Sequence, residues 1–590
     1  MLRGSWAARP RYHYATDELC VVVSLDGSDS AAEAEDKRQG ELYRRVWETL
    51  SGALVPLIRD VQSERTADDG IAKDLAPLRP GAQPGGDRPL RLLERAYVSP
   101  DRSLDGDTLR PWVTLPGRKE TIALYFYGIG PKAERDAPLD QANASVVRGL
   151  VKLINRQREQ ISGRLARVGE GRTQLLAATP NWLIGPAQDG IVAGGPGTTP
   201  ELVPASAATT GAGPRFRFPV DPRSQGPRKI DLQAIVDRQR LAVEVPDDER
   251  RVVVAVLDTC PLAADVKEKV ADLDARGHPN RLLAEVAAHV AIDTPRFVPP
   301  GYFDGQLRHI EPNYKLIPYD RGDHRIPDHG LFAAGIVRDI APTARIHLIR
   351  VLDDKGIGDL LVLIHALRAL PDHPSFQERR LIINLSLTVD LPIRERLSAF
   401  WGRPAPGERE EAEEAWELEI HRSLASVFDW LRERGVLVVA AAGNDADDPP
   451  VPTRRPEPRL PARYDNVLGV AAVNSDMAPA HFSNRGDFIQ FGNGVAVFGG
   501  DDLTQGVARD AIIGIFSAER MPFTNKTNDT GWARWSGTSF ATPIISAIAA
   551  NFWTENHATS SEIMRTVTSD FVTGATVGDL ACAAVVAEQT

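Results

Sequence analysis

The sequence has few cysteines and no long apolar run. Cys20, Cys260 and Cys582 are the only cysteines among 590 residues, and they lie too far apart to form a metal-ligand spacing or a disulfide framework. The simplest interpretation is three small, buried apolar residues. No uninterrupted apolar run approaches the roughly 20 residues that a membrane-spanning helix needs. No membrane role is therefore expected.

The N-terminus also lacks the apolar core of a secretory signal, because residues 1–16 are rich in Arg and aromatic residues. We therefore expect a cytoplasmic protein. The net charge is −11, with 69 Lys and Arg against 80 Asp and Glu. This acidity argues against nucleic acid as the main partner. With 42% hydrophobic and 25% charged residues, the composition is that of an ordinary globular protein.

Composition and periodicity divide the chain into three parts. Residues 1–178 combine alternating strand patterns with amphipathic helix patterns, which predicts a separate α+β domain. Residues 179–228 are rich in Gly and Pro and predict a linker that is open to proteolysis. Residues 229–590 form the third part. In the first part the expected strands are 19–25 and 121–127, and the expected helices are 31–58 and 140–161.

The third part alternates apolar strands with helices. Short runs of Val, Ile and Leu predict strands that are buried on both faces, hence an α/β fold with a mostly parallel sheet covered by helices on both sides. Functional sites in such sheets form beyond the carboxyl ends of the strands. The expected strands are 251–257, 345–352, 381–387, 436–442 and 467–473, and the expected helices include 329–340, 360–370 and 417–434.

Four polar residues lie at the ends of these expected elements. Each alone has an ordinary interpretation as a turn residue, a helix cap or a core histidine. Together they supply a hydroxyl nucleophile, an imidazole base, a carboxylate that orients the base, and an amide that can stabilise an oxyanion. Acyl transfer needs this set of groups. In chain order the residues are Asp258, His329, Asn444 and Ser539.

The stretches around these residues resemble the subtilisin-like serine proteases, the subtilases. The order Asp, His, Ser is the order of that family, and the likeness extends over about residues 229–570. It implies that Asp258 orients, His329 acts as general base and acid, and Ser539 is the nucleophile. Asn444 would be the oxyanion donor of a serine endopeptidase that works through an acyl-enzyme. The matching stretches are Val254-Ala255-Val256-Leu257-Asp258-Thr259, Asp328-His329-Gly330, Ala440-Ala441-Ala442-Gly443-Asn444 and Gly537-Thr538-Ser539-Phe540-Ala541-Thr542-Pro543.

The resemblance also implies where a peptide substrate binds. One run resembles an edge strand of the family's cleft, a second run resembles the opposite edge, and two residues precede the oxyanion amide. A peptide between the edges would gain backbone hydrogen bonds on both sides. The implied substrate-binding residues are Gly356, Ile357 and Gly358, then Ser386, Leu387 and Thr388, and finally Ala442 and Gly443.

Departures from the family pattern leave an alternative open. Cys260 stands where the family usually has Gly, and Leu331-Phe332 stand where it usually has Thr-His. The alternative is a catalytically impaired subtilase-fold protein with a binding or regulatory role. Asp445, with Asp447 and Asp448, follows Asn444, and this acidity suggests the hypothesis that Lys or Arg is favoured near the scissile bond. The alternative interpretation is solvated surface charge.

The extra N-terminal domain predicts regulation. It is expected to cap the cleft or act as a prosegment, with a linker that the enzyme cuts itself. The rival interpretation is that the domain binds a regulatory protein partner and never inhibits. The expected partner of the whole chain is a peptide or protein substrate, with neither nucleic acid nor membrane. No cofactor is expected for certain, although scattered loop oxygens leave a structural calcium ion open.

Overall fold

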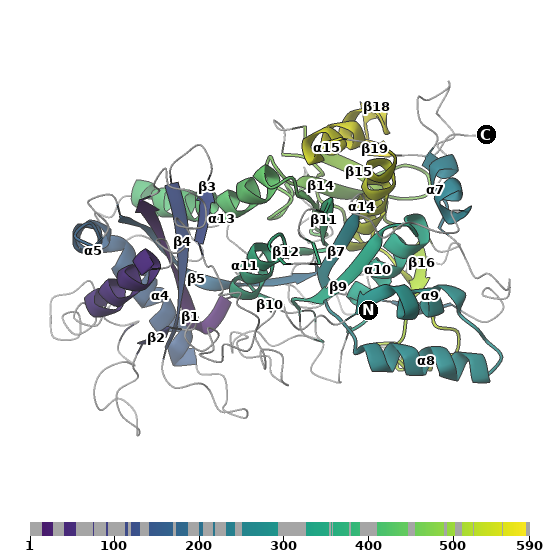
Figure 1. The fold of residues 1–590 in the computed structure, drawn as a ribbon, viewed down its shortest axis with the longest axis horizontal. Helices are drawn as coiled ribbons and strands as arrows, with labels where there is room; N and C mark the ends of the chain where they lie inside the picture. The colour runs from purple at the N-terminus through teal and green to yellow at the C-terminus, as the bar shows by residue number, and fades with distance from the viewer. Residues whose placement is uncertain are drawn as a thin grey trace, which may run out of the picture.

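The structure is a computed structural model. It describes residues 14–26, 41–54, 75, 90–92, 112–115, 120–129, 141–168, 173–186, 200–203, 216–218, 232–241, 251–292, 326–389, 410–446, 455–488, 492–501 and 510–585, apart from 353, 355, 357, 374, 377, 378, 523 and 557. Two sheets lie side by side, the N-terminal one at the left of Figure 1 and the larger one at the right.

The N-terminal domain is an antiparallel sheet with helices. Its strands run in the order β5-β1-β4-β2, with β3 also paired to β4. Helical residues 41–54 separate β1 from β2, and two helices separate β4 from β5. This is the split β-α-β arrangement. The elements are β1 (Tyr14–Asp26), β2 (Leu90–Leu92), β3 (Trp112–Leu115), β4 (Glu120–Ile129), α4 (Gln141–Arg156), α5 (Arg158–Leu165) and β5 (Gln174–Pro186).

The second domain, called the α/β domain below, contains a nine-stranded sheet in the order β18-β19-β15-β14-β13-β11-β7-β9-β8. All neighbouring pairs are parallel except β18 and β19. The predicted parallel α/β fold is therefore confirmed. The sheet strands are β7 (Val253–Asp258), β8 (Val290–Ile292), β9 (Arg345–Arg350), β11 (Leu381–Leu385), β13 (Leu437–Ala441), β14 (Leu468–Val473), β15 (Gly494–Phe498), β18 (Val572–Thr576) and β19 (Ala583–Val585).

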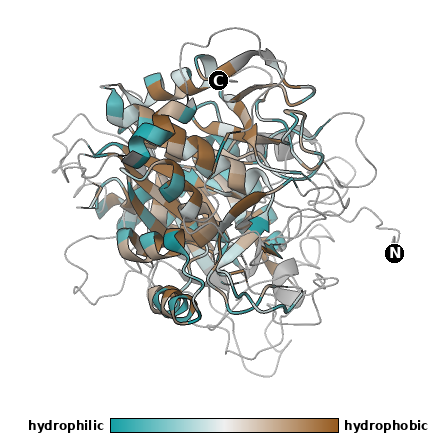
Figure 2. Ribbon diagram, turned by 90° about the vertical axis from the view of Figure 1, so that its right-hand side faces the viewer, coloured by the Kyte–Doolittle hydropathy of each residue, from teal (hydrophilic) through white to brown (hydrophobic). Residues whose placement is uncertain are grey.

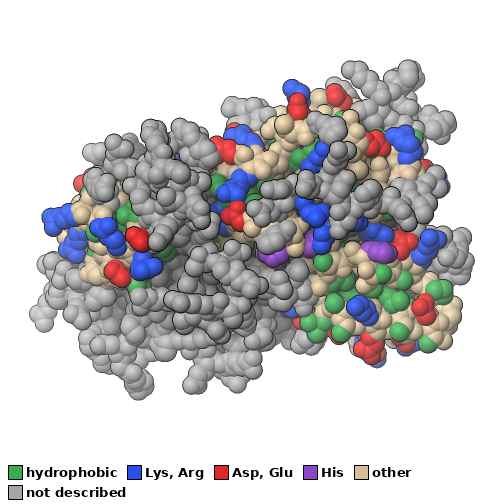
Figure 3. All heavy atoms as spheres, viewed as in Figure 1, with side chains coloured by type: hydrophobic (Ala, Val, Ile, Leu, Met, Phe, Trp, Pro, Cys, Tyr) green, Lys and Arg blue, Asp and Glu red, His purple; other side chains and the backbone are tan. Residues whose placement is uncertain are grey.

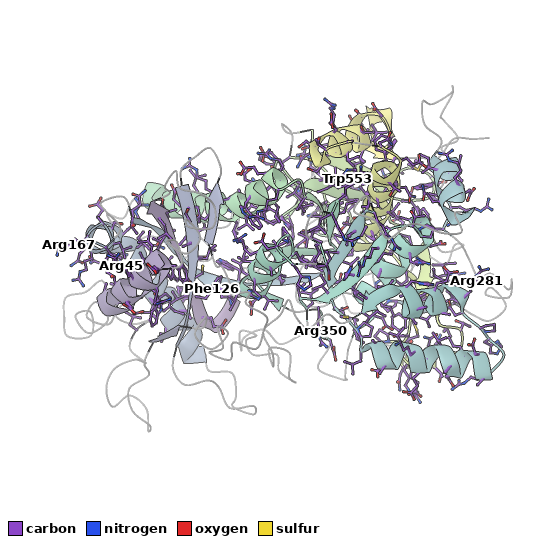
Figure 4. All side chains as sticks on the ribbon, viewed as in Figure 1. Arg45, Phe126, Arg167, Arg281, Arg350 and Trp553 are labelled. Atoms are coloured by element: carbon purple, nitrogen blue, oxygen red, sulfur yellow. The ribbon has the colours of Figure 1, made fainter. Side chains whose placement is uncertain are left out.

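Helices cover this sheet, and the apolar strands lie inside them (Figure 2). Figure 4 labels one core residue of each domain, Phe126 on β4 and Trp553 on α14, both buried. The helices are α7 (Leu232–Leu241), α8 (Ala263–Ala275), α9 (Arg281–His289), α10 (His329–Ile340), α11 (Leu360–Ala369), α13 (Glu410–Glu433), α14 (Thr538–Glu555) and α15 (Ser560–Ser569). Five further short strands lie in the described residues: β6 (Glu201–Leu202), β10 (Gly358–Asp359), β12 (Leu387–Val389), β16 (Ile512–Ile515) and β17 (Trp532–Trp535).

The two domains share one apolar core. Leu19 of β1, Leu363 of α11 and Leu431 of α13 belong to the same buried cluster, which also contains Val253 and Leu257 of β7. Helices α11 and α13 of the α/β domain contact β5. The continuous apolar run of β1 is thus explained, because its residues are buried against α4 and belong to this shared core.

The structure differs from the expected boundaries at both ends of the linker. The boundary after residue 178 falls inside β5, which continues to Pro186. Farther on, β6 adds to β17 as an antiparallel strand, and Val203 is fully buried. Phe218 is also buried, and Arg240 of α7 donates a hydrogen bond to the Phe216 carbonyl. Residues 200–203 and 216–218 therefore pack as parts of the α/β domain.

Candidate functional site

Asp258 and His329 meet at the carboxyl end of β7. The Asp258 carboxylate Oδ1 lies 2.8 Å from His329 Nδ1 and also accepts a hydrogen bond from Thr259 N at 2.6 Å. Both side chains are buried. A Cβ on Gly330 would collide with the Thr259 carbonyl oxygen, so only glycine lets α10 begin this close to β7. The pairing fixes the imidazole with Nδ1 toward the carboxylate and Nε2 available for proton transfer.

The residue before the histidine anchors the start of α10. The Asp328 carboxylate accepts hydrogen bonds from Ser517 N, Ser517 Oγ and Ala518 N at 2.6–2.7 Å. Burial raises the pKa of Asp328, and these hydrogen bonds oppose the rise. The loop that follows β16 thereby holds the first turn of α10, and with it the imidazole of His329.

Ser539 lies in the first turn of α14, where backbone N–H groups have no partner within the helix. Its hydroxyl donates to the Ser386 carbonyl at 3.2 Å, and the Ser386 hydroxyl donates back to the Ser539 carbonyl at 2.6 Å. No hydrogen bond among the described residues joins His329 to Ser539. The imidazole instead contacts the next residue, with its ring centre 5.0 Å from that of Phe540. Catalytic hydrogen bonds are often long in resting sites and tighten with substrate.

Asn444 is held by the residue that precedes the serine. Thr538 N and Thr538 Oγ1 both donate to Asn444 Oδ1, at 3.0 and 2.9 Å. Because a backbone N–H can only donate, the atom facing it is the amide oxygen, and the NH₂ group of Asn444 remains as a donor. Thr538 also accepts from Gly443 N at 3.3 Å. The sequence reasoning missed Thr538 as a positioning residue, although its place directly before Ser539 was visible.

The two expected edges of the cleft are paired with the chain's own β5. On one side, Gly358 of β10 pairs with Ile184, and Asp359 pairs with Leu183. On the other side, β12 runs along residues 184–186, with Leu387 opposite Pro186 and Val389 opposite Ile184. Both pairings are antiparallel. Residues 183–186 thus occupy the position that the resemblance implies for a substrate.

The remaining expected substrate contacts have mixed outcomes. The carbonyl oxygen of Gly356 lies 3.2 Å from the place where a Cβ on Gly185 would be. Gly356 therefore lies close to the β5 backbone at Gly185. Ile357 lies outside the described residues. Ala442 is committed to the sheet, because its N–H donates to Val470 and its carbonyl accepts from Arg459. Gly443 bonds to Thr538 and, through its carbonyl, to the Asn484 N–H.

The expected basic preference finds no support at Asp445. Its carboxylate is paired with Arg459 through two contacts, Nε to Oδ2 at 2.6 Å and Nη2 to Oδ1 at 2.8 Å. Asn484 Nδ2 donates a further hydrogen bond to Oδ2 at 2.7 Å. Asp445 is buried, so its charge is already satisfied within the protein. Asp447 and Asp448 lie outside the described residues.

Within the described ranges, no group of three or more His, Cys, Asp or Glu side chains is arranged to hold a metal ion. These residues thus provide no carboxylate cluster for the calcium ion that the sequence left open. None of the described helices is both long and apolar enough to cross a membrane. The three cysteines are buried, and none of them forms a disulfide bond.

The fold and the site together define an α/β scaffold with a buried Asp–His pair, a serine at a helix N-terminus and an amide donor. The aspartate and the amide lie at the carboxyl ends of the parallel strands β7 and β13. The chain belongs to the subtilase family, because the Peptidase_S8 (Subtilase family) model matches residues 249–577. Minor extracellular protease Epr of Bacillus subtilis (strain 168) is 27% identical over 252 residues, covering 41% of this chain and 29% of that protein.

A second relative gives a similar match. Thermophilic serine proteinase of Bacillus sp. (strain AK1) is 25% identical over 247 residues, covering 40% of this chain and 45% of that protein. The chain thus spans less than half the length of these curated relatives. Among solved structures, Sphericase and S41 Psychrophilic Protease align at 19% and 18% identity, each with a TM-score of 0.35 over 61% of this chain and 97% of their own.

Proposed function

We propose that this chain is a serine endopeptidase that hydrolyses peptide bonds through an acyl-enzyme. Ser539 is the nucleophile, His329 the general base and acid, Asp258 the orienting carboxylate and Asn444 the oxyanion donor. The observation that carries the proposal is the bound segment of β5. It lies between β10 and β12, and its last described residue, Pro186, pairs with Leu387, directly after Ser386.

The proposed steps use the Asp258–His329 pair, the Ser539 hydroxyl and the Asn444 amide described above. His329 Nε2 takes the proton of Ser539 Oγ as the oxygen attacks the carbonyl carbon, and the tetrahedral oxyanion receives hydrogen bonds from Asn444 Nδ2 and the Ser539 backbone N–H. The imidazolium then protonates the leaving amine, and the C–N bond breaks. Water repeats the sequence on the acyl-enzyme and releases the acid. Asp258 stays ionised and stabilises the imidazolium through Nδ1.

The N-terminal domain is part of the proposal, as an inhibitor that fills the cleft until it is cut. Ile184 is buried in the shared core, and a Cβ on Gly358 would lie 3.0 Å from its Cγ1. This close fit supports an apolar residue and then Gly-Pro as a preferred substrate sequence. The proposed cut falls between Pro186 and Pro200, because β5 ends at the first and β6, which belongs to the α/β domain, follows the second.

The test compares the wild-type chain with Ser539→Ala. Intact mass and N-terminal sequencing should show wild-type fragments that separate between Pro186 and Pro200, while Ser539→Ala remains one chain. Adding active protein to Ser539→Ala shows whether the cut can also occur between molecules. Full-length wild type under all conditions, or cuts at other positions, would contradict self-processing.

One observation favours a second candidate, the catalytically impaired binding protein. The Ser539 hydroxyl is engaged with the Ser386 carbonyl and not with His329. A fluorophosphonate probe separates the two functions, since it reacts only with an activated serine. Cytoplasmic location and the absence of nucleic-acid partners stay predictions from the sequence. Cell fractionation tests the first of them.

A further inference from the structure

One buried amide side chain holds the turn that carries Asn444. Asn484 follows β14 in the chain and is fully buried, at 0% exposed. Its Nδ2 donates to the Ala442 carbonyl at 3.2 Å and to Asp445 Oδ2 at 2.7 Å, and its Oδ1 accepts from Asp445 N at 2.8 Å. Its backbone N–H donates to the Gly443 carbonyl at 2.9 Å. Asn484 thus contacts the residues on both sides of Asn444.

The direction of these hydrogen bonds fixes the amide of Asn484. A backbone N–H can only donate, so the atom that faces Asp445 N is the amide oxygen. The NH₂ group then faces oxygens alone. These are the carbonyls of Ala442 and Glu457, both at 3.2 Å, and the Asp445 carboxylate. Asn is the one side chain of this length that carries both an NH₂ donor and a carbonyl acceptor.

The turn is packed closely against Asn484. Gly443 has a φ of +112°, and a Cβ on it would lie 2.6 Å from Asn484 Nδ2, so this approach requires glycine. On the face drawn in Figure 3, charged side chains lie at the surface of the described residues, where water screens them. Asp445 is only 8% exposed and relies on Arg459 and Asn484 as partners. Moving the turn would leave this buried carboxylate unpaired, which is costly.

Asn444 differs from its neighbours in this turn. It is partly exposed, whereas residues 441–443 and 445–446 are buried. The hydrogen bonds of Asn484 act on the backbone of the turn, and those of Thr538 act on the Asn444 side chain. Together they set the direction in which Asn444 Nδ2 points.

We propose that Asn484 is a positioning residue for catalysis: it holds the backbone of residues 442–445 so that Asn444 Nδ2 faces the oxyanion. The proposal rests on the proposed role of Asn444 as the oxyanion donor. Because Asn484 is fully buried, it acts through Asn444 and not on the substrate itself. Oxyanion donors have to be held in place before the charge develops, since reorganising them at that moment costs rate.

Hydrogen exchange at single-residue resolution tests this hold in the full-length Ser539→Ala chain, which lacks the nucleophile for a self-cut. The two reporters are the Gly443 and Thr538 N–H groups, which donate to Thr538 Oγ1 and to Asn444 Oδ1. Neither reporter uses Asn484 as its acceptor, so both acceptors remain when Asn484 is replaced. In Asn484→Ala we expect both reporters to exchange about tenfold faster, because the turn is no longer held against Thr538.

Asn493→Ala is the matched control. Asn493 is also a buried amide, 2% exposed, and its Nδ2 donates to the Tyr464 and Val467 carbonyls at 2.6 Å. It directly precedes β15, at the amino end of the parallel strands and so opposite the turn. Both reporters should keep the parent's exchange rate in this variant. Unchanged reporters in Asn484→Ala, or equally faster reporters in Asn493→Ala, would overturn the proposal.

Asn484→Ser is a second variant that keeps the test decisive if the alanine variant does not fold. Its single hydroxyl proton cannot serve the three oxygens that face Asn484 Nδ2. The reporters should therefore exchange faster than in the parent, and parent-like rates would count against the proposal. Protection of the β7 amides shows in each variant that the domain is folded.

Steady-state kinetics with a peptide substrate connect this hold to catalysis. Asn484→Ala should lower kcat about tenfold to hundredfold and leave KM within about twofold of the wild type. In the Asn444→Ala background the same change should have almost no further effect on kcat. A purely structural role would lower kcat equally in both backgrounds, and that result would also overturn the proposal.

The two measurements separate this proposal from the peptidase assignment. A wild type without peptidase activity would refute the assignment, while the exchange rates would still decide whether Asn484 holds the turn. An active wild type with unchanged reporters in Asn484→Ala would leave the assignment standing and overturn the positioning role.

Discussion

Thr538→Val should lower kcat without changing KM. Valine has nearly the same shape as threonine but lacks the hydroxyl that donates to Asn444 Oδ1 at 2.9 Å and accepts from Gly443 N at 3.3 Å. The Thr538 backbone N–H still holds the amide, at 3.0 Å. Asn444 therefore keeps one of its two contacts with Thr538 and loses orientation only in part.

The magnitude follows from the lost contact. One net hydrogen bond is worth about 0.5–1.5 kcal/mol, which corresponds to roughly a twofold to thirteenfold fall in kcat. Asn444→Ala removes the donor itself and should reduce kcat by about 10²–10³, a range measured on subtilisin, a member of this family, and not obtained from this structure. The decrease in kcat should thus be much smaller for Thr538→Val than for Asn444→Ala.

A double-mutant cycle tests whether Thr538 acts through Asn444. Steady-state kinetics with a peptide ending in the Ile-Gly-Pro sequence of β5 give kcat and KM for wild type, both single variants and the double variant. If Thr538 only positions the amide, Thr538→Val should have almost no further effect in the Asn444→Ala background. An equal loss of kcat in both backgrounds would refute the reasoning.

Three further predictions concern stability and specificity. Burial lowers the pKa of His347 to about 4, so the unfolded chain binds a proton more readily and stability is lost as the pH falls from about 6.5 to 4. Denaturant unfolding measures the free energy of unfolding at each pH. Between pH 6.5 and 4 this free energy should fall by up to about 3 kcal/mol less in His347→Leu than in the wild type. In the same assay at pH 7, Val203→Ala should destabilise the chain by about 1–3 kcal/mol because Val203, directly after β6, belongs to the buried core. The exposed Leu262→Ala should change stability by less than about 0.5 kcal/mol. Asp445→Asn should leave the ratio of cleavage after Arg and Leu unchanged, because Arg459 already pairs with that carboxylate; a fall in cleavage after Arg would restore the rejected idea.

The sequence predicted the α/β scaffold because its strands are buried on both faces. The apolar runs at 251–257 and 467–473 agree with β7 and β14 to within two residues, and the expected helix 329–340 is α10 itself. Hydrophobic periodicity and composition predict the strands and helices correctly where the local sequence pattern agrees with the tertiary environment.

The misjudged features depend on contacts between distant residues. Gly185 and Pro186 have the composition of a linker, yet they are strand residues because β12 pairs with them. The two residues before them, Leu183 and Ile184, pair with β10. In the sequence, the charge of Asp445 resembles exposed surface acidity. In the structure, Arg459 pairs with this carboxylate. Thr538 looks like an ordinary cap, and only the position of Asn444 reveals its second partner. Local patterns carry no information about such partners.

Labelling by a fluorophosphonate is the most direct test of the assigned site. The probe is added to the full-length chain at pH 8, before and after removal of the N-terminal domain by the chain's own cut, and mass spectrometry locates the adduct. The account predicts labelling of Ser539 that increases after the cut and disappears in His329→Ala. A cut chain that stays unlabelled, or an adduct on another residue, would contradict the assignment of Ser539 as an activated nucleophile.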